Sequence, residues 1–205
     1  MSKSFETFPK IARLSRECVI TEKIDGTNAQ IYITETLSLD DEGCPLHRVG
    51  ADGPWIAAGS RNRWITPEDD NYGFARWVRD NAEELILLGP GRHFGEWWGR
   101  GIQRGYGLSE KRFSLFNVGR WWHWGQGTFD DTVGKPGPQC CNTVPILYQD
   151  EFTTGNIDDT LRTLGLVGSQ ASPGFMDPEG IVIWHTAAKT LFKKTLVNDA
   201  KGKTE

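Results

Sequence analysis

Apolar and polar residues alternate along several short stretches of the chain, a pattern that predicts β-strands. Between residues 29 and 34, Ala29, Ile31 and Ile33 alternate with polar neighbours, as in a strand with one buried face. Further strands are expected at residues 18–20, 55–58, 93–98, 113–118, 180–184 and 191–197. Residues 39–54 are rich in Asp, Gly and Pro and predict a hairpin excursion.

Apolar residues at helical spacing predict two helices. The first covers residues 72–88 and ends at Gly89-Pro90-Gly91. The second covers residues 156–164, with Thr154 or Asn156 as its cap. Residues 121–145, with glycines, prolines and paired cysteines, predict an irregular loop. Strands mixed with a few helices, without a regular βαβ alternation, indicate an α+β fold built on antiparallel sheets.

Length and composition narrow the classes of function. A chain of 205 residues is in the ordinary range for one domain. It lacks a basic-then-apolar leader and an apolar run of the ~18 residues that a membrane span requires, so we expect a soluble cytoplasmic protein without a membrane partner. The net charge of −4 argues against a protein that coats nucleic acid by bulk electrostatics. A polyanion would therefore have to be bound locally.

The cysteines favour reduced thiols over a disulfide or a metal site. Cys140 and Cys141 are adjacent, and a disulfide between neighbours would be badly strained. A zinc site from Cys44, His47, Cys140 and Cys141 is the alternative, but the usual ligand spacing is missing.

Basic and aromatic residues are interleaved between residues 92 and 120, where the overall charge balance reverses. This basic–aromatic segment contains Arg92, Arg100, Arg104, Lys111, Arg112 and Arg120, with Trp97, Trp98, Tyr106, Trp121 and Trp122 among or beside them. Such a mixture is typical of surfaces that bind single-stranded nucleic acid. The alternative is a solvated basic face over a tryptophan-rich core.

Six short motifs follow one another along the chain. They are Lys23-Ile24-Asp25-Gly26, Ser60-Arg61-Asn62-Arg63, Phe94-Gly95-Glu96, Phe113-Ser114-Leu115-Phe116, Pro178-Glu179-Gly180-Ile181-Val182 and Phe192-Lys193-Lys194. In type and order they resemble the motifs of covalent nucleotidyltransferases, the superfamily of ATP-dependent DNA ligases, RNA ligases and mRNA capping enzymes. The resemblance implies the α+β nucleotidyltransferase fold, with antiparallel sheets flanked by helices and an ATP pocket between them. It also implies a single domain over residues 1–205, without the C-terminal OB-fold or helical domain of larger relatives.

The resemblance makes Lys23, expected in the turn between two strands, a nucleophile that takes AMP from ATP. An unperturbed lysine titrates near 10.4, so its neutral form at pH 7 costs roughly 4–5 kcal/mol unless neighbours lower the pKa. The resemblance supplies cations that do so, namely Arg61, a lysine of the last strand and a divalent metal ion, Mg²⁺ or Mn²⁺.

The other roles come from the resemblance as well. It implies catalytic roles for Lys23, Asp25 and Lys193, nucleotide-binding roles for Glu22, Asn28, Arg61, Glu96, Phe116 and Lys193, a metal-binding role for Glu179, and possible RNA contacts for Arg63, Arg100 and Arg104. Phe116 is expected to stack on adenine, with Phe113 as the alternative, and Glu96 to bind a ribose hydroxyl. Asp25 would order the lysine loop or help later steps, and Glu22 would reach the base through its backbone.

The last motif departs from the family pattern. Relatives commonly have Lys-x-Lys, whereas Lys193 and Lys194 are adjacent and must point to opposite sides of a strand. We expect Lys193 to face the phosphates, because it directly follows the aromatic residue, and Lys194 to lie on the surface.

Asn28 distinguishes the members of the superfamily. Lys-x-Asp-Gly-Thr-Asn resembles the nick-sealing RNA ligases of phages and bacteria, whereas DNA ligases and capping enzymes tend to have arginine at this position. We therefore expect an ATP-dependent RNA ligase, in a bacterial or phage-infected cell, that joins a 5′-phosphate to a 3′-hydroxyl. It would use RNA in preference to DNA, with a protein partner for recruitment as an option. The alternatives are a DNA ligase, a 5′-end adenylylating enzyme, an mRNA guanylyltransferase and a catalytically idle nick- or nucleotide-binding module.

Overall fold

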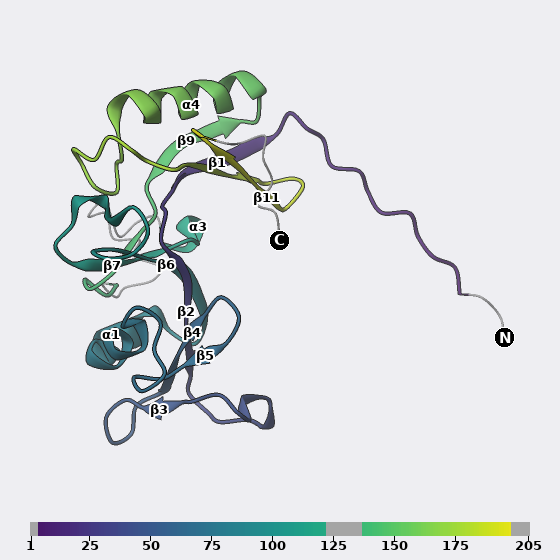
Figure 1. Cartoon of the computed structure of the whole chain (residues 1–205). Coiled ribbons are helices and arrows are strands. Elements are labelled where there is room, and N and C mark those ends of the chain that lie inside the picture. Colours follow the sequence, from purple (N-terminus) through teal and green to yellow (C-terminus); the bar gives the residue numbers. More distant parts are fainter. Residues whose placement is uncertain (1–3, 122–136, 198–205) are drawn as a thin grey trace.

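The computed structural model describes residues 4–121 and 137–197, and its strands form two sheets (Figure 1). The strands are β1 (Glu17–Lys23), β2 (Thr27–Thr34), β3 (His47–Arg48), β4 (Trp55–Ser60), β5 (Trp64–Ile65), β6 (Gly91–Gly99), β7 (Lys111–Leu115), β8 (Asn142–Thr143), β9 (Ile146–Glu151), β10 (Gly180–His185) and β11 (Thr190–Thr195). The helices are α1 (Phe74–Asp80), α2 (Ala82–Leu85), α3 (Val118–Trp121) and α4 (Thr154–Val167), with short 3₁₀ turns η1 (Leu39–Asp41), η2 (Ile86–Leu88) and η3 (Gly105–Gly107). None of the helices in these ranges is long and apolar enough to cross a bilayer.

The two sheets differ in size. The small sheet has four strands in the order β11-β10-β1-β9. The large sheet has the order β3-β4-β2-β6-β7-β8, with β5 paired to β4. The pairs are antiparallel, apart from the parallel pair β7–β8. The α+β class with mainly antiparallel sheets is thus confirmed.

Helix α4 covers one face of the small sheet (Figure 1). Ile20 of β1 and Ile183 of β10 are paired across the strands and pack with Ile157 and Leu164 of α4. The helix begins after Thr153, whose hydroxyl accepts a hydrogen bond from the Asn156 N–H at 3.1 Å. The expected cap at Thr154 or Asn156 is therefore off by one residue or more. The other face of the small sheet carries Lys23.

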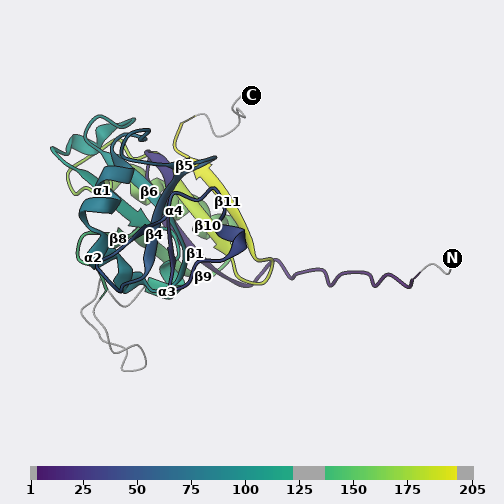
Figure 2. The ribbon, with the colours of Figure 1, turned by 90° about the horizontal axis from the view of Figure 1, so that it is seen from below.

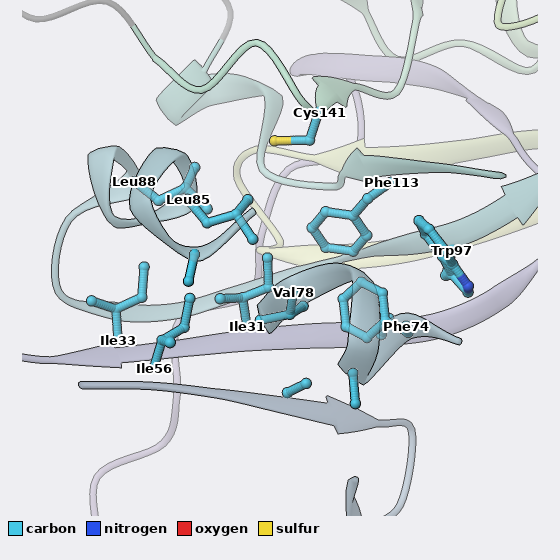
Figure 3. Close-up of a cluster of buried hydrophobic side chains, with 14 of the residues drawn as sticks. Ile31, Ile33, Ile56, Phe74, Val78, Leu85, Leu88, Trp97, Phe113 and Cys141 are labelled. Carbon is cyan, nitrogen blue, oxygen red and sulfur yellow. The ribbon is translucent and has the colours of Figure 1, made fainter. Parts of the chain in front are cut away.

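Helices α1 and α2 cover the large sheet, and their contact holds the largest core (Figure 3). Ile31 of β2 and Ile56 of β4 are fully buried there, with Phe74 and Val78 from α1. The sequence predicts one helix over residues 72–88, but the structure breaks it at Asn81. The Asn81 side chain donates to the Trp77 carbonyl at 2.7 Å, the kind of side-chain bond to the backbone that competes with helix continuation.

The chain passes from one sheet to the other in three residues, because Lys23 ends β1 and Thr27 begins β2. The sequence predicts Lys23 in the turn, but the structure places it as the last residue of strand β1. Beneath this crossing lies a third apolar cluster of Ile24, Trp98, Tyr106 and Val144. The N-terminal segment, residues 4–13, has no helix or strand and projects away from both sheets (Figure 2).

Candidate functional site

Lys23 and Glu179 meet at the open face of the small sheet. The antiparallel pairing of β1 and β10 aligns Lys23 with Gly180, which places Glu179 next to the lysine. The Lys23 ammonium forms an ion pair with the Glu179 carboxylate, and both side chains are largely buried. A Cβ atom at position 180 would lie 2.3 Å from the Lys194 carbonyl oxygen, so only glycine fits beside β11.

The loop after Lys23 is packed tightly against the large sheet. A Cβ atom at position 26 would lie 2.5 Å from the Trp97 carbonyl oxygen and 2.8 Å from Trp98 Cβ, which explains the glycine of the first motif. The Asp25 N–H donates to the Tyr106 hydroxyl at 2.8 Å, and the Asp25 carboxylate accepts from Arg104 Nε at 3.0 Å. The lysine loop is thus held on both its backbone and its side chain.

Glu96 and Asn28 face each other across β6 and β2. Asn28 Nδ2 donates to Glu96 at 2.8 Å, and the Gly26 N–H donates to the other carboxylate oxygen at 3.1 Å. Burial raises the pKa of Glu96 to about 7, because desolvation outweighs the lowering by the Asn28 hydrogen bond and the Lys23 charge. A carboxylate with such a pKa is poised to change its protonation near neutral pH.

The Glu22 side chain has a structural task. It is 1% exposed and accepts hydrogen bonds from the Ser169 hydroxyl at 2.5 Å and from the N–H groups of Gln170 and Ala171 at 2.8 and 2.9 Å. These bonds fix the loop that follows α4 against the end of β1. The sequence gives no local signal for this contact, and a base contact through the Glu22 backbone stays a prediction.

Lys193 and Lys194 lie on opposite faces of the small sheet. Lys194 is paired with Ile181, on the face covered by α4, and forms an ion pair with Asp158 of that helix. Lys193 is paired with Val182, on the same face as Lys23. The structure thus brings Lys193, Lys23 and Glu179 to one face.

Arg61 and Arg63 lie in the turn between β4 and β5 and are exposed. Arg61 directly follows Ser60, the partner of Ala29, so it continues the row of Asn28 across the sheet. Arg63 forms a two-pronged ion pair with Asp69, at 2.5 and 3.0 Å. An RNA contact by Arg63 would have to replace that pair.

The aromatic residues separate clearly by burial. Phe113 is 1% exposed and packs on Phe74 with ring centroids 5.1 Å apart, so the alternative of Phe113 as the adenine stacker is wrong. Phe116 is 42% exposed, and its N–H donates to the Phe94 carbonyl at 2.9 Å. Phe94, 52% exposed and two residues before Glu96, is a second exposed ring on this face, and the resemblance assigns it no role. The alternation along β6 is the sequence signal for this ring, because it places Phe94 on the same face as Glu96.

The aromatic side chains of the basic–aromatic segment lie mainly inside the protein, whereas Arg92, Arg100, Lys111 and Arg120 are exposed. Four aromatic side chains are buried, as the alternative of a tryptophan-rich core predicts: Trp97, Trp98, Tyr106 and Trp121. Arg104 and Arg112 form ion pairs, with Asp25 and Asp177 and with Glu110. Arg100 is exposed beside an open hollow of about 530 Å³ that Trp77 and Lys111 also line. Trp122 lies outside the described residues.

The cysteines are free thiols, as the sequence predicts. Across residues 4–121 and 137–197, no three His, Cys, Asp or Glu side chains are grouped as metal ligands, so Cys44, His47, Cys140 and Cys141 do not form the alternative zinc site there.

Comparison with known proteins identifies the fold that carries this site. The RNA ligase family model matches residues 16–195. The chain belongs to the RNA ligase family. A comparison with curated proteins finds no match. Among solved structures, a mutant of Naegleria gruberi RNA ligase with ATP and Mn is similar with a TM-score of 0.56 and 21% identity, covering 88% of this chain and 50% of that chain.

A second Naegleria gruberi RNA ligase mutant, with AMP and Mn, has a TM-score of 0.55 and 21% identity, over 88% of this chain and 49% of that chain. The chain therefore spans about half the length of these solved RNA ligases. The likeness shows that the two-sheet arrangement is the nucleotidyltransferase-like fold of RNA ligases.

Proposed function

We propose that this member of the RNA ligase family is an ATP-dependent RNA ligase that forms a covalent lysyl-AMP on Lys23. The observation that carries the proposal is the meeting of Lys23 and Glu179 between the two sheets, with Lys193 on the same face. A nucleophilic amine, a carboxylate and a second cation are what transfer of a nucleotidyl group to nitrogen requires.

In the first step the neutral amine of Lys23 attacks the α-phosphorus of ATP. The bond from nitrogen to phosphorus forms, the bond from that phosphorus to the bridging oxygen breaks, pyrophosphate leaves, and the amine releases a proton to solvent. The Lys23 nitrogen is engaged in the ion pair with Glu179. The pair must therefore open before the amine can react.

The Glu179 carboxylate fits a divalent cation. Mg²⁺ and Mn²⁺ prefer oxygen ligands and are often held by one or two carboxylates together with substrate phosphates. Such an ion, held by Glu179, would neutralise phosphate charge and disfavour the ammonium form of Lys23. The presence of ATP and Mn in the structures of the Naegleria gruberi relative supports these cofactors, and we extend them to Mg²⁺.

The surrounding residues take the binding roles. Lys193 neutralises the phosphates from the face that it shares with Lys23, and Arg61 binds a phosphate or the 3′-end region. Glu96, with Asn28 beside it, accepts a hydrogen bond from a ribose hydroxyl, and Phe116 stacks on adenine. Asp25 orders the lysine loop through its bonds to Tyr106 and Arg104.

The later steps join RNA ends. AMP passes from Lys23 to a 5′-phosphate, and a 3′-hydroxyl then displaces AMP to form the phosphodiester. Asn28 supports RNA over DNA as substrate, because an amide can both donate to and accept from the 2′-hydroxyl. We place the activity in nick-sealing RNA repair in the cytoplasm of a bacterial or phage-infected cell.

Self-adenylylation tests the proposal. The protein is incubated with α-labelled ATP and Mg²⁺, and label on the denatured chain is measured for the wild type, for Lys23→Ala and for the matched control Lys10→Ala in the exposed N-terminal segment. We expect label on the wild type and the control, and a loss of at least about a thousandfold in Lys23→Ala. Label that survives in Lys23→Ala refutes the lysyl-AMP, and unlabelled wild type that binds nicks tightly supports the idle binding module.

Two substrate comparisons separate the enzymes of this superfamily. Label from α-labelled GTP in place of ATP would indicate a guanylyltransferase. Sealing of nicked DNA in preference to nicked RNA would indicate a DNA ligase, and adenylylated 5′-ends without sealing would indicate an end-adenylylating enzyme.

A further inference from the structure

The connection between β6 and β7 reaches under the lysine loop, and its backbone is unusual. Gln103 and Tyr106 have φ values of 45° and 52°, in the left-handed region that side chains other than glycine seldom adopt. Ile102, 0% exposed, anchors the connection in the core of the large sheet. Tyr106, 1% exposed, anchors it in the apolar cluster between the sheets. The connection is therefore held firmly at two points.

Arg104 lies between these anchors and bridges two other loops. Its Nε donates to the Asp25 carboxylate at 3.0 Å. Its Nη1 lies 2.7 Å from the Asp177 carboxylate and donates to the Asp177 carbonyl at 3.0 Å. Asp25 follows Lys23 by two residues, and Asp177 precedes Glu179 by two residues. One guanidinium thus joins the loop that directly follows the nucleophile to the loop that carries its carboxylate partner.

We propose that Arg104 is a positioning residue for nucleotidyl transfer, which sets Lys23 and Glu179 at the correct separation by holding Asp25 and Asp177. This role rests on the proposed function. Arginine suits the task because its planar fork offers donors along two edges, whereas lysine is a single point charge. The role replaces the RNA contact that the sequence suggests for Arg104, since Nε and Nη1 of the guanidinium are already bonded to aspartates.

The ion pairs have the geometry and burial that such a role needs. The Arg104 and Asp25 side chains are 26% and 27% exposed, so water screens this pair less than a surface pair. Asp177 is 72% exposed, and its contribution comes from the combination of carboxylate and carbonyl contacts to one nitrogen. Small displacements of reacting groups can cost about a hundredfold in rate, so a bridge of modest strength can have a large kinetic effect.

The test is the single-turnover rate of self-adenylylation as a function of ATP concentration. We expect Arg104→Gln to lower the maximal rate about 30- to 100-fold while the half-saturating ATP concentration changes less than about threefold. Arg104→Lys keeps the charge but cannot bridge both loops, so it should retain a defect of at least about tenfold. The matched control is Arg162→Gln, which breaks an exposed Arg–Asp pair with Asp159 and should leave both parameters unchanged.

Asp177→Asn separates positioning from a general effect on folding. Alone it should slow the maximal rate several-fold, and in the Arg104→Gln background it should add less than about twofold, because both changes break the same bridge. If Arg104→Gln does not fold, Arg104→Lys and Asp177→Asn carry the same test.

Three results would overturn this role: maximal rates like wild type, additive effects of the two substitutions, or normal adenylylation with a defect only in RNA sealing. The last result would return Arg104 to an RNA contact. Absence of label on the wild type would refute the proposed function itself, and with it this role. Label on the wild type with unaffected variants refutes only the role of Arg104.

Discussion

The small sheet and the large sheet contribute different kinds of residue to the site. The small sheet and its adjoining loop carry the charged groups Lys23, Glu179 and Lys193, to which the proposed function gives the bond-making chemistry. The large sheet carries Asn28 and Glu96, which suit recognition of a sugar. Strand β11 is largely exposed, whereas β6 is largely buried. The proposed function thus places the chemistry on the smaller, more exposed sheet and recognition on the larger sheet with the larger core.

Substitutions of Lys193 and Lys194 give the sharpest test of the catalytic role proposed for the small sheet. We expect Lys193→Ala to slow self-adenylylation about 10²- to 10³-fold, because a cation aimed at the phosphates is lost. Lys194→Ala, its matched control on the α4 face, should stay within about threefold, since its exposed ion pair with Asp158 lies on the face away from Lys23. Rates of adenylylation under saturating ATP decide the point. The opposite ranking would mean that the α4 face holds the phosphates.

The local patterns predict much of the fold but little of the contact network. Alternation and helical spacing identify the main strands and α4, because each depends on neighbours within a few residues. The break at Asn81 escapes them, since it depends on one side-chain bond to the Trp77 carbonyl. The collinear motifs predict the meeting of Lys23 with Glu179, although these residues are 156 positions apart.

Strand β6 is buried on both faces, which explains why its tryptophans do not form the nucleic-acid surface that the sequence suggests. Alternation predicts that one of the neighbours Trp97 and Trp98 faces solvent, yet both are 2% exposed. Trp97 packs in the core of the large sheet, whereas Trp98 packs in the cluster beneath the lysine loop. Two separate cores meet at this strand, and no local pattern encodes that. The bonds of Arg104 to Asp25 and of Glu22 to the loop after α4 also join residues far apart in the sequence, so no local pattern predicts them.

The pH dependence of stability tests whether burial raises the pKa of Glu96 on the large sheet. Its folded-state pKa is raised to about 7, so between about pH 4.5 and pH 7 the folded protein holds a proton that the unfolded chain has lost. Stability from this group is therefore present at low pH and falls as the pH rises through that window, by up to about 3 kcal/mol. In Glu96→Gln this fall should be absent, so the difference in free energy of unfolding between wild type and variant should change across the window. Urea unfolding at several pH values measures it, and a difference independent of pH contradicts the expectation.

The smallest expected effect concerns the exposed rings of the large-sheet side. Phe116→Leu keeps an apolar side chain but removes the aromatic face, which is worth about 0.5–1.5 kcal/mol in a stacked pair. We expect the half-saturating ATP concentration for adenylylation to rise about three- to tenfold while the maximal rate stays within about twofold, because stacking binds ATP without touching the phosphates. Phe94→Leu is the matched control, since Phe94 is a neighbouring ring with similar exposure, and it should leave ATP saturation unchanged. A rise in the half-saturating ATP concentration in Phe94→Leu alone would indicate that adenine stacks on Phe94. A fall in the maximal rate of Phe116→Leu would contradict the division between the sheets, because a residue of the recognition side would then affect the chemical step.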